Sequence, residues 1–215
     1  MTLRELQVLV KEGEHRTLEF KRKANHPDKI MKEVVAFANT AGGELLVGVD
    51  DDGSIPGVKH VEEEVYVLEH ALEKYCRPQI DYTLEVIRIS GLRGVIRCTI
   101  LESERKPHFV IEDFKTRKGP AYIRVADRSI RASREVREVL RRQRKNRDIQ
   151  FSYGDKERVL MQYLEEHPHI TIPQFSEIAR LNRYRASRTL VLLVLANVLE
   201  LIPQEGGADF YSLKG

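Results

Sequence analysis

FANTAGGELLVGVDDDG, residues 37–53, joins the end of a helix, a buried strand and a tight turn in one short run. Apolar residues recur at helical spacing before it, and Gly42-Gly43 permits the positive φ angles at which a helix exits. The apolar run 45–49 is too short for a helix, which predicts a strand covered on both faces. Gly48 leaves a gap in that strand where a backbone or a ligand can approach closely. The acidic residues that follow end in glycine and predict a tight turn. On local grounds alone, the run is simply a helix, a turn and a hairpin.

The composition indicates one domain of ordinary size followed by a small second one. The chain has 215 residues, of which 41% are hydrophobic, so it can bury substantial cores. Cys76 and Cys98 have neither a CxxC partner nor a histidine-rich neighbourhood, so we expect buried or half-buried thiols rather than a disulfide framework or a zinc site. No apolar stretch approaches the eighteen or so residues needed to span a membrane. We therefore expect a cytoplasmic protein with no membrane partner.

The positive charge of the chain is concentrated in one segment. Residues 124–147 hold ten Lys and Arg against three acids, 10 − 3 = +7, so the remainder of a chain with net charge +3 sums to 3 − 7 = −4. A basic block on an otherwise mildly acidic protein is typical of a site for a polyanion. The alternative is a solvated helix whose charges have no partner.

The order of the expected elements predicts an α+β fold for the first 145 residues, with helices around a mixed or antiparallel sheet. Ser133 offers an N-cap for the helix that carries most of the basic block. We expect helices over residues 3–11, 30–38, 58–77 and 134–143, and strands over residues 14–21, 45–49, 82–89, 94–100, 108–111 and 121–125.

Charged residues cluster around the first expected strand. Its apolar positions alternate with charged ones, so Glu19 and Lys21 would share the outward face of a half-exposed strand. Glu14 lies five residues before Glu19, which puts the two on opposite faces of a straight strand. The two carboxylates can converge only if the chain bends near His15.

The last sixty residues predict three helices and a hairpin, the pattern of a winged helix. The helix-turn-helix would comprise residues 173–182 and 184–199, with the hairpin turning at Gly206-Gly207. In such domains the start of the last helix enters the major groove, where arginine reads guanine edges and grips phosphates. Residues 155–215 sum to 7 − 8 = −1, so a protein-contact role is the alternative. The side chains that the last helix presents first are Asn182, Arg183, Tyr184, Arg185, Ser187 and Arg188.

The strings EHRTLEFK, AFANTAGGELLVGVDDDGSIPGV, RPQI, KPHFV and AYIRVADRSIRAS, followed by a basic helix, resemble the Schlafen/AlbA-type DNA-binding domain. The resemblance covers roughly residues 5–142 in the family's order, and the central block is its most specific part. The family holds nucleic-acid-binding proteins, among them prokaryotic transcriptional regulators, and nucleases. The chain has one copy of the domain where the Schlafen core pairs two lobes, so a two-lobed groove would require a homodimer.

The resemblance to the Schlafen RNases implies a site of three carboxylates, Glu14, Glu19 and Asp51, with Asp50 as the neighbour of Asp51 if the register differs by one. Such a cluster can hold Mg²⁺ or Mn²⁺ for phosphodiester cleavage. Lys21 would contact a phosphate beside it. The family is also described as ATP-binding, but the chain has neither GxxxxGK[ST] nor GxGxxG.

The sequence is therefore interpreted as a DNA-binding transcriptional regulator that prefers DNA to RNA, requires no cofactor for binding and forms a homodimer. A metal-dependent nuclease is the alternative, and a nucleotide-binding or protein-interaction module comes third. The expected domains are residues 1–146 and 155–215, joined by a linker at 147–154. The expected contacts to nucleic acid are Lys21, Arg131, Arg134, Arg137, Arg141, Arg142, Arg144, Arg183, Tyr184, Arg185 and Arg188.

Overall fold

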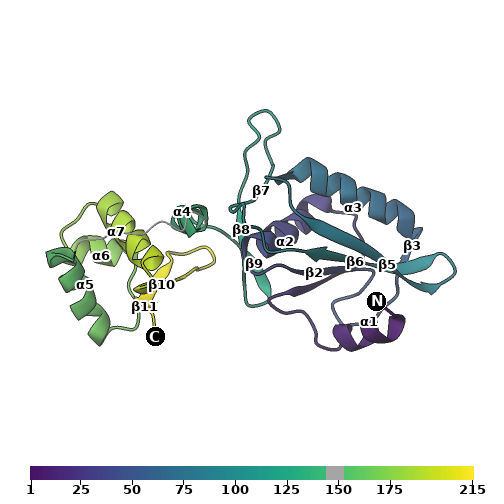
Figure 1. The fold of residues 1–215 in the computed structure, drawn as a ribbon, viewed down its shortest axis with the longest axis horizontal. Coiled ribbons are helices and arrows are strands. Elements are labelled where there is room, and N and C mark those ends of the chain that lie inside the picture. The colour runs from purple at the N-terminus through teal and green to yellow at the C-terminus, as the bar shows by residue number, and fades with distance from the viewer. Residues whose placement is uncertain (144–152) are drawn as a thin grey trace. The chain divides into compact units, whose positions relative to one another are not determined.

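The structure, a computed structural model, describes residues 1–143 and 153–215, which form two compact units (Figure 1). The first unit comprises residues 1–131 and the second residues 132–215. This division differs from the expected one at residue 146, because the basic helix α4 (Arg134–Gln143) groups with the second unit. The expected linker falls largely outside the described residues.

A mixed five-stranded sheet forms the centre of the first unit. Strand β1 (Leu18–Lys21) runs parallel to β2 (Gly43–Val47), and β2 runs antiparallel to β6 (Arg93–Ile100). The short strand β3 (Val58–Lys59) continues the β2 edge by pairing with the start of β6. On the other edge of β6 lies β5 (Tyr82–Ser90), antiparallel to it. The α+β class expected from the sequence is confirmed.

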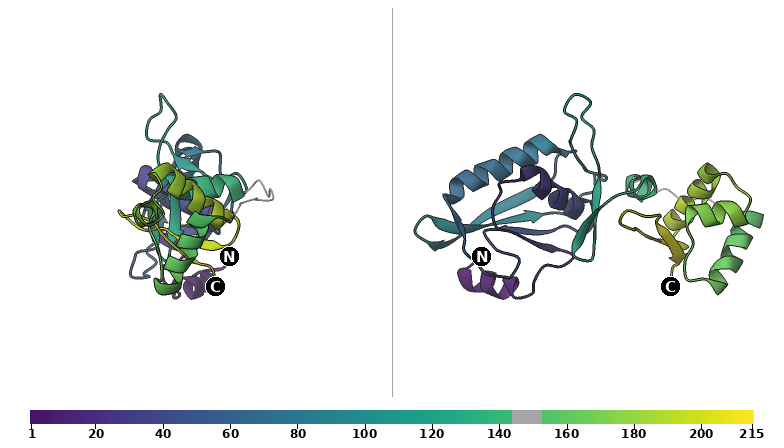
Figure 2. Two further views of the ribbon diagram at one scale, coloured as in Figure 1. Left: turned by 90° about the vertical axis from the view of Figure 1, so that its left-hand side faces the viewer. Right: turned by 180° about the vertical axis from the view of Figure 1, so that it is seen from behind.

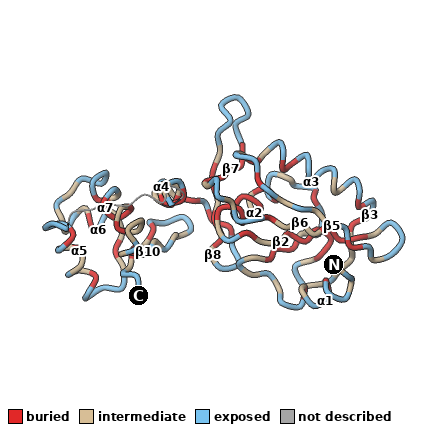
Figure 3. Tube along the Cα trace, in the orientation of Figure 1, coloured by how far each residue is buried: buried red, intermediate tan, exposed pale blue. Residues whose placement is uncertain are grey.

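Helices cover both faces of this sheet (Figures 1 and 2). Helices α2 (Pro27–Asn39) and α3 (Val61–Tyr75) pack on one face, and α1 (Leu3–Val10) packs on the other. The central strands are buried between these layers, as Figure 3 shows for β2 and β6. Strand β2 is thus covered on both faces, which its continuous apolar sequence predicted.

The stretch at residues 37–53 forms the predicted helix end, strand and turn. Helix α2 ends at Asn39, and Gly42 turns the chain with φ +73°. Gly48 has φ +108°, and a Cβ atom on it would lie 3.1 Å from the amide nitrogen of Val58 and 3.2 Å from the carbonyl oxygen of Gly94. The close approach predicted at Gly48 is therefore made by backbone.

Asn39 and Thr40, which the sequence indicated only as residues that end a helix, also join α2 to the later part of the unit. The buried Asn39 side chain donates to the carbonyl oxygens of His108 and Tyr122 and accepts from the His108 amide. The Thr40 hydroxyl donates to the Ala36 carbonyl and accepts from the Arg124 amide. These side chains satisfy backbone groups that would otherwise be buried without partners.

Two expectations about the first unit were wrong in detail. The segment expected as one helix over 58–77 contains β3, α3 and then β4 (Cys76–Arg77), which pairs with β7 (Phe109–Val110). Strand β8 (Tyr122–Val125) forms a hairpin with β9 (Arg128–Arg131), a strand that the sequence analysis did not include. Its short polar sequence carries almost no period-two apolar signal.

The second unit contains four described helices and a hairpin. Its first helix, α4, begins after Ser133, whose hydroxyl accepts from the Val136 amide as the predicted N-cap. Helix α7 (Arg183–Leu195) is capped in the same way by Asn182. The remaining elements are α5 (Asp155–Glu166), α6 (Ile172–Ile178) and the antiparallel strands β10 (Leu199–Ile202) and β11 (Phe210–Leu213).

Both cysteines are free and buried in the first unit, as expected. Burial raises the pKa of each thiol, Cys76 and Cys98, to about 12, so neither is a reactive thiolate near neutral pH. In the part of the chain that the structure describes, no helix combines the length and apolarity needed to cross a bilayer.

Candidate functional site

The chain bends before β1, as convergence of the first two glutamates requires. Residues 16 and 17 form a turn closed by paired backbone bonds between His15 and Leu18. This turn brings Glu14 back to the strand, where its Oε1 accepts from the Phe20 amide at 2.8 Å. Partial burial raises the Glu14 pKa, and the negative charges of Glu19 and Asp51 add to the effect against the opposing Phe20 hydrogen bond. The charges of the other two expected carboxylates therefore both reach Glu14.

Glu19 does not lie on an exposed face: only 7% of the residue is accessible. The Arg124 guanidinium, fully buried, donates from Nη1 to Glu19 at 3.0 Å and to Glu33 at 2.8 Å. Its Nη2 donates to the His15 carbonyl at 2.8 Å, and its plane lies over the Phe37 ring at 4.8 Å. The half-exposed strand expected here was wrong, because β8 and α2 cover its outer face with a buried ion cluster.

Lys21 completes the neutralisation of Glu19. Its ammonium donates to Glu19 Oε1 and, at 2.8 Å, to the Phe20 carbonyl. Both oxygens of Glu19 are therefore bound by cations of the chain itself. Within the described residues, no three His, Cys, Asp or Glu side chains are grouped so that they could hold one metal ion. The residues present do not fit the metal site that the Schlafen RNases imply.

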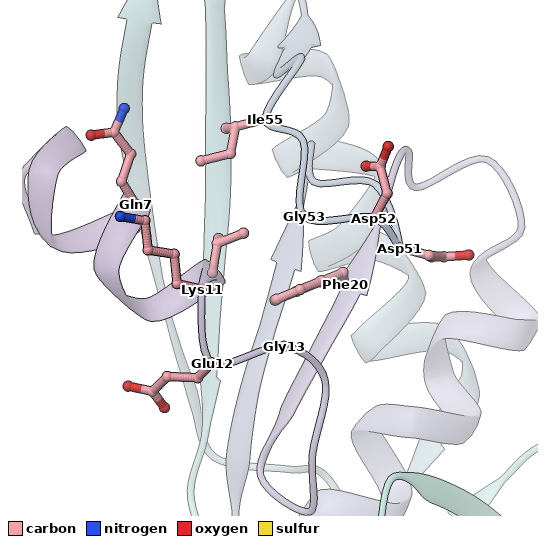
Figure 4. Close-up of a pocket in the computed structure, with 10 residues that line it drawn as sticks. Gln7, Lys11, Glu12, Gly13, Phe20, Asp51, Asp52, Gly53 and Ile55 are labelled. Atoms are coloured by element: carbon pink, nitrogen blue, oxygen red, sulfur yellow. The ribbon is translucent and has the colours of Figure 1, made fainter.

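Asp51 borders a separate hollow of about 720 Å³ between the end of α1 and the turn after β2 (Figure 4). Asp52 and Glu12 line the same hollow, with Lys11 as the basic residue among the lining side chains. Asp50 is directed to Arg22, with 3.5 Å between Oδ1 and Nε. The hollow does not include Glu14 or Glu19 among its lining residues, so the acidic turn and the buried cluster are different features.

Helix α4 separates its apolar and basic side chains. Val136, Val139 and Leu140 are buried, whereas Arg134 and Arg141 are exposed. Two of the expected nucleic-acid contacts on this helix already have partners within the protein. Arg137 donates to the Ser133 carbonyl, and Arg141 pairs with Glu138 at 2.8 Å. Arg134 and Arg142 form no ion pair with any carboxylate of the described chain.

The start of α7 presents the side chains that the sequence predicted. Arg183, Tyr184, Arg185 and Arg188 are all exposed, with 60% of Tyr184 accessible. The core face of the same helix consists of Ala186, Thr189, Leu190 and Leu193, which alternate with the exposed positions at helical spacing.

The two basic sets meet within the second unit. A groove of about 420 Å³ lies between α4 and α7, and four of the expected contacts line it: Arg134, Arg142, Tyr184 and Arg188. Across the groove, Glu135 of α4 accepts from the Ser187 hydroxyl of α7 at 2.7 Å. Ser187 was expected among the presented side chains, but this hydrogen bond occupies it. Sequence reasoning did not identify the pair, which joins residues 52 positions apart.

The remaining expected contacts lie elsewhere. Arg131 is exposed on β9 in the first unit, opposite Tyr122. Arg144 lies outside the described residues. Arg124 belongs to the basic block by sequence, but its charge is balanced inside the fold and is not available to an external polyanion.

A family model and two solved structures are similar to this chain. The family model described as "Schlafen, AlbA_2" matches residues 14–133, more than half of the chain. The structure of the DIP2311 protein from Corynebacterium diphtheriae is 19% identical with a TM-score of 0.45, covering 71% of this chain and 35% of that one. The solution structure titled "N-terminal Domain of Putative ATP-dependent DNA Helicase RecG-related Protein", from Nitrosomonas europaea, is 20% identical with a TM-score of 0.41, covering 60% of this chain and 92% of that one.

This chain spans about a third of the DIP2311 protein's length. No curated protein sequence matches it. The match of the family model runs from Glu14, through the buried ion cluster of Glu19 and Arg124, to Ser133 at the start of the second unit. By that match, the chain belongs to the Schlafen, AlbA_2 family.

Proposed function

We propose that the protein binds nucleic acid, duplex DNA in preference to RNA, and acts as a transcriptional regulator. The observation that carries the proposal is the groove between α4 and α7, where Arg134, Arg142 and Arg188 have no ion-pair partner in the described chain. Unpaired guanidiniums on one surface are suited to neighbouring phosphates of a nucleic-acid backbone. Membership of the Schlafen, AlbA_2 family is consistent with a nucleic-acid partner.

In this proposal the second unit is a winged helix in which α6 and α7 form the helix-turn-helix and the β10–β11 hairpin is the wing. The N-terminal turn of α7 enters the major groove, and Arg183 and Arg185 contact base edges. Ser187 is bound to Glu135 and so contributes to packing rather than to base recognition. Arg134 and Arg142 on α4 contact phosphates next to the groove.

We propose a homodimer as the DNA-bound form, because a single winged helix buries a small interface and two-fold symmetry doubles it. Sedimentation of the protein with a DNA duplex containing an inverted repeat measures the stoichiometry. Two chains per duplex are expected. One chain per duplex at saturation contradicts the dimer without affecting the proposal of DNA binding.

Binding is tested with labelled duplex DNA over a series of salt concentrations. The slope of log K against log salt reports the number of phosphate contacts, and Arg142→Ala is expected to reduce that slope by about one. Arg158→Ala is the matched control, because Arg158 lies in the same unit but already pairs with Asp155 at 2.7 Å. Equal effects of the two variants, or binding without salt dependence, contradict the proposed surface.

The same samples, run on denaturing gels with Mg²⁺ or Mn²⁺, test the nuclease alternative. Intact nucleic acid is expected, because the carboxylate that would bind metal is occupied by Lys21 and Arg124. Metal-dependent cleavage that Glu19→Ala abolishes, while duplex binding is retained, would overturn the proposal and make the carboxylates an active site.

A further inference from the structure

An exposed loop joins β7 to β8 in the first unit and rises above β7 in Figure 1. Every residue from 112 to 118 is exposed. Asp113 fixes the conformation of the turn: its carboxylate accepts from the Lys115 amide at 2.9 Å and from the Thr116 hydroxyl at 2.7 Å. Backbone bonds between Asp113 and Lys118 close the base. The side chains on this loop therefore project from a defined frame.

The loop carries an aromatic ring, Phe114, that contacts the protein on one side and is open to solvent on the other. The Phe114 ring lies edge-on to Tyr75 of α3, with 5.5 Å between ring centroids and an angle of 66° between planes. The Lys74 ammonium lies 5.2 Å from the Tyr75 centroid and 5.4 Å from the Phe114 centroid. Phe114 nevertheless remains 51% accessible. A large apolar ring held in place at this exposure offers a surface for a planar ligand.

Three more cations follow this ring along the loop. Lys115, Arg117 and Lys118 are exposed, and none forms an ion pair with a carboxylate of the described residues. The neighbouring Asp113 carboxylate is used by the loop itself. Aromatic side chains interleaved with unpaired cations form the pattern with which proteins bind single strands, since bases stack on the rings while cations contact the phosphates.

We propose that the 112–119 loop, with Lys74 and Tyr75, is a stacking platform for single-stranded nucleic acid. The site goes beyond the proposed duplex contacts, because it lies in the other unit and uses exposed bases rather than groove edges. The exposed apolar surface of the loop is about that of one ring, Phe114. This area is enough to stack one base, and it is too small to anchor the loop in a bilayer. The charges beside it match the phosphates on either side of that base.

The absence of tryptophan from the chain gives a direct test. Phe114→Trp places a single indole on the platform of the full-length protein, and stacking of a base quenches its fluorescence. Titration with oligo(dT) and oligo(U) is expected to give saturable quenching, with the same dissociation constant as anisotropy of the labelled oligonucleotide. The two oligonucleotides distinguish DNA from RNA as the source of the strand.

The matched control is Tyr66→Trp on α3. Tyr66 is 70% accessible and stacks on His70 at 6.2 Å, but Glu63 and Glu69, three residues before and after it on the same helix, repel phosphates. No quenching is expected at this position. Because the signal arises at the substituted residue, binding by the second unit does not imitate it, and duplex binding can fail or succeed independently.

Two further variants separate stacking from charge. Phe114→Ala is expected to weaken single-strand binding about tenfold, whereas Phe114→Tyr retains it. Replacing Lys115, Arg117 and Lys118 together by glutamine is expected to flatten the salt dependence while leaving the Phe114–Tyr75 contact intact. Four results would overturn the platform: no quenching at position 114, equal quenching at position 66, no oligonucleotide binding, or an indole that responds only to anionic phosphatidylserine vesicles.

Discussion

Replacing Arg124 by methionine should destabilise the first unit far more than a typical arginine substitution. Methionine approximates the length of the side chain but removes the charge that Glu19 and Glu33 face at 3.0 and 2.8 Å. Removal of one partner from a buried ion pair costs about 3–5 kcal/mol, because the other charge stays buried. For a unit of this size, that corresponds to a fall in melting temperature of about 10–15 °C.

The measurement is a urea titration combined with amide exchange of β1 and β2, which reports on the first unit separately. Arg131→Met is the control, since Arg131 lies on the same hairpin but is exposed, and it should change the free energy of unfolding by less than about 0.5 kcal/mol. Glu19→Gln combined with Arg124→Met should be less destabilising than the sum of the single changes, by about 0.5–3 kcal/mol. Equal losses of unfolding free energy for Arg124→Met and Arg131→Met would refute the stabilising role of the buried ion cluster. Strict additivity of the Glu19 and Arg124 substitutions would refute it as well.

Three further predictions concern other parts of the chain. Gly48→Ala should cost about 1–3 kcal/mol in urea unfolding, because its Cβ would crowd backbone at a φ of +108°; Gly13→Ala, at φ +73° with open space around it, should cost less. Glu14→Gln should stabilise the fold near pH 7, because the raised pKa of Glu14 means that the folded protein disfavours its ionised form. In a pH series of melting temperatures, the difference between the two proteins should vanish below pH 4.5, the ordinary pKa of Glu, where the carboxyl is protonated in both the folded and the unfolded chain. Arg185→Ala should relax base preference in a selection from randomised duplexes, at about 1–3 kcal/mol for the position it contacts, while Arg142→Ala weakens all sequences alike.

The elements that the sequence predicted well are those with strong local patterns. The apolar run of β2 and the glycines around it specified a strand buried on both faces, and Asn182 and Ser133 fall at helix starts because their side chains satisfy free amides. The short strand β9 could not be predicted in the same way, since four residues of mixed polarity have no distinctive period.

The candidate site was less predictable because its decisive contacts are long-range. The role of Arg124 depends on Glu19, 105 positions away, and no local pattern connects them. An arginine between the apolar Ile123 and Val125 was a signal of a buried charge, but not of its partner. Similarly, the surface at α7 was predicted from the arginines at the start of the helix, whereas its packing against α4 includes the long-range hydrogen bond between Glu135 and Ser187, which no local pattern reveals.

The junction between the units affects how the protein can be divided. Strand β9 ends at Arg131 and α4 starts at Arg134, so the chain passes from one unit to the other within two intervening residues. If the chain were cut at the polar stretch near residue 147, α4 would stay attached to the first unit and lose its packing in the second. Val139 and Leu140, which are buried in the intact protein, would then be exposed to water. Such fragments would tend to aggregate, and their failure to bind DNA would be mistaken for a property of the intact molecule. Cleavage between Arg131 and Ala132 would leave each unit with its own core.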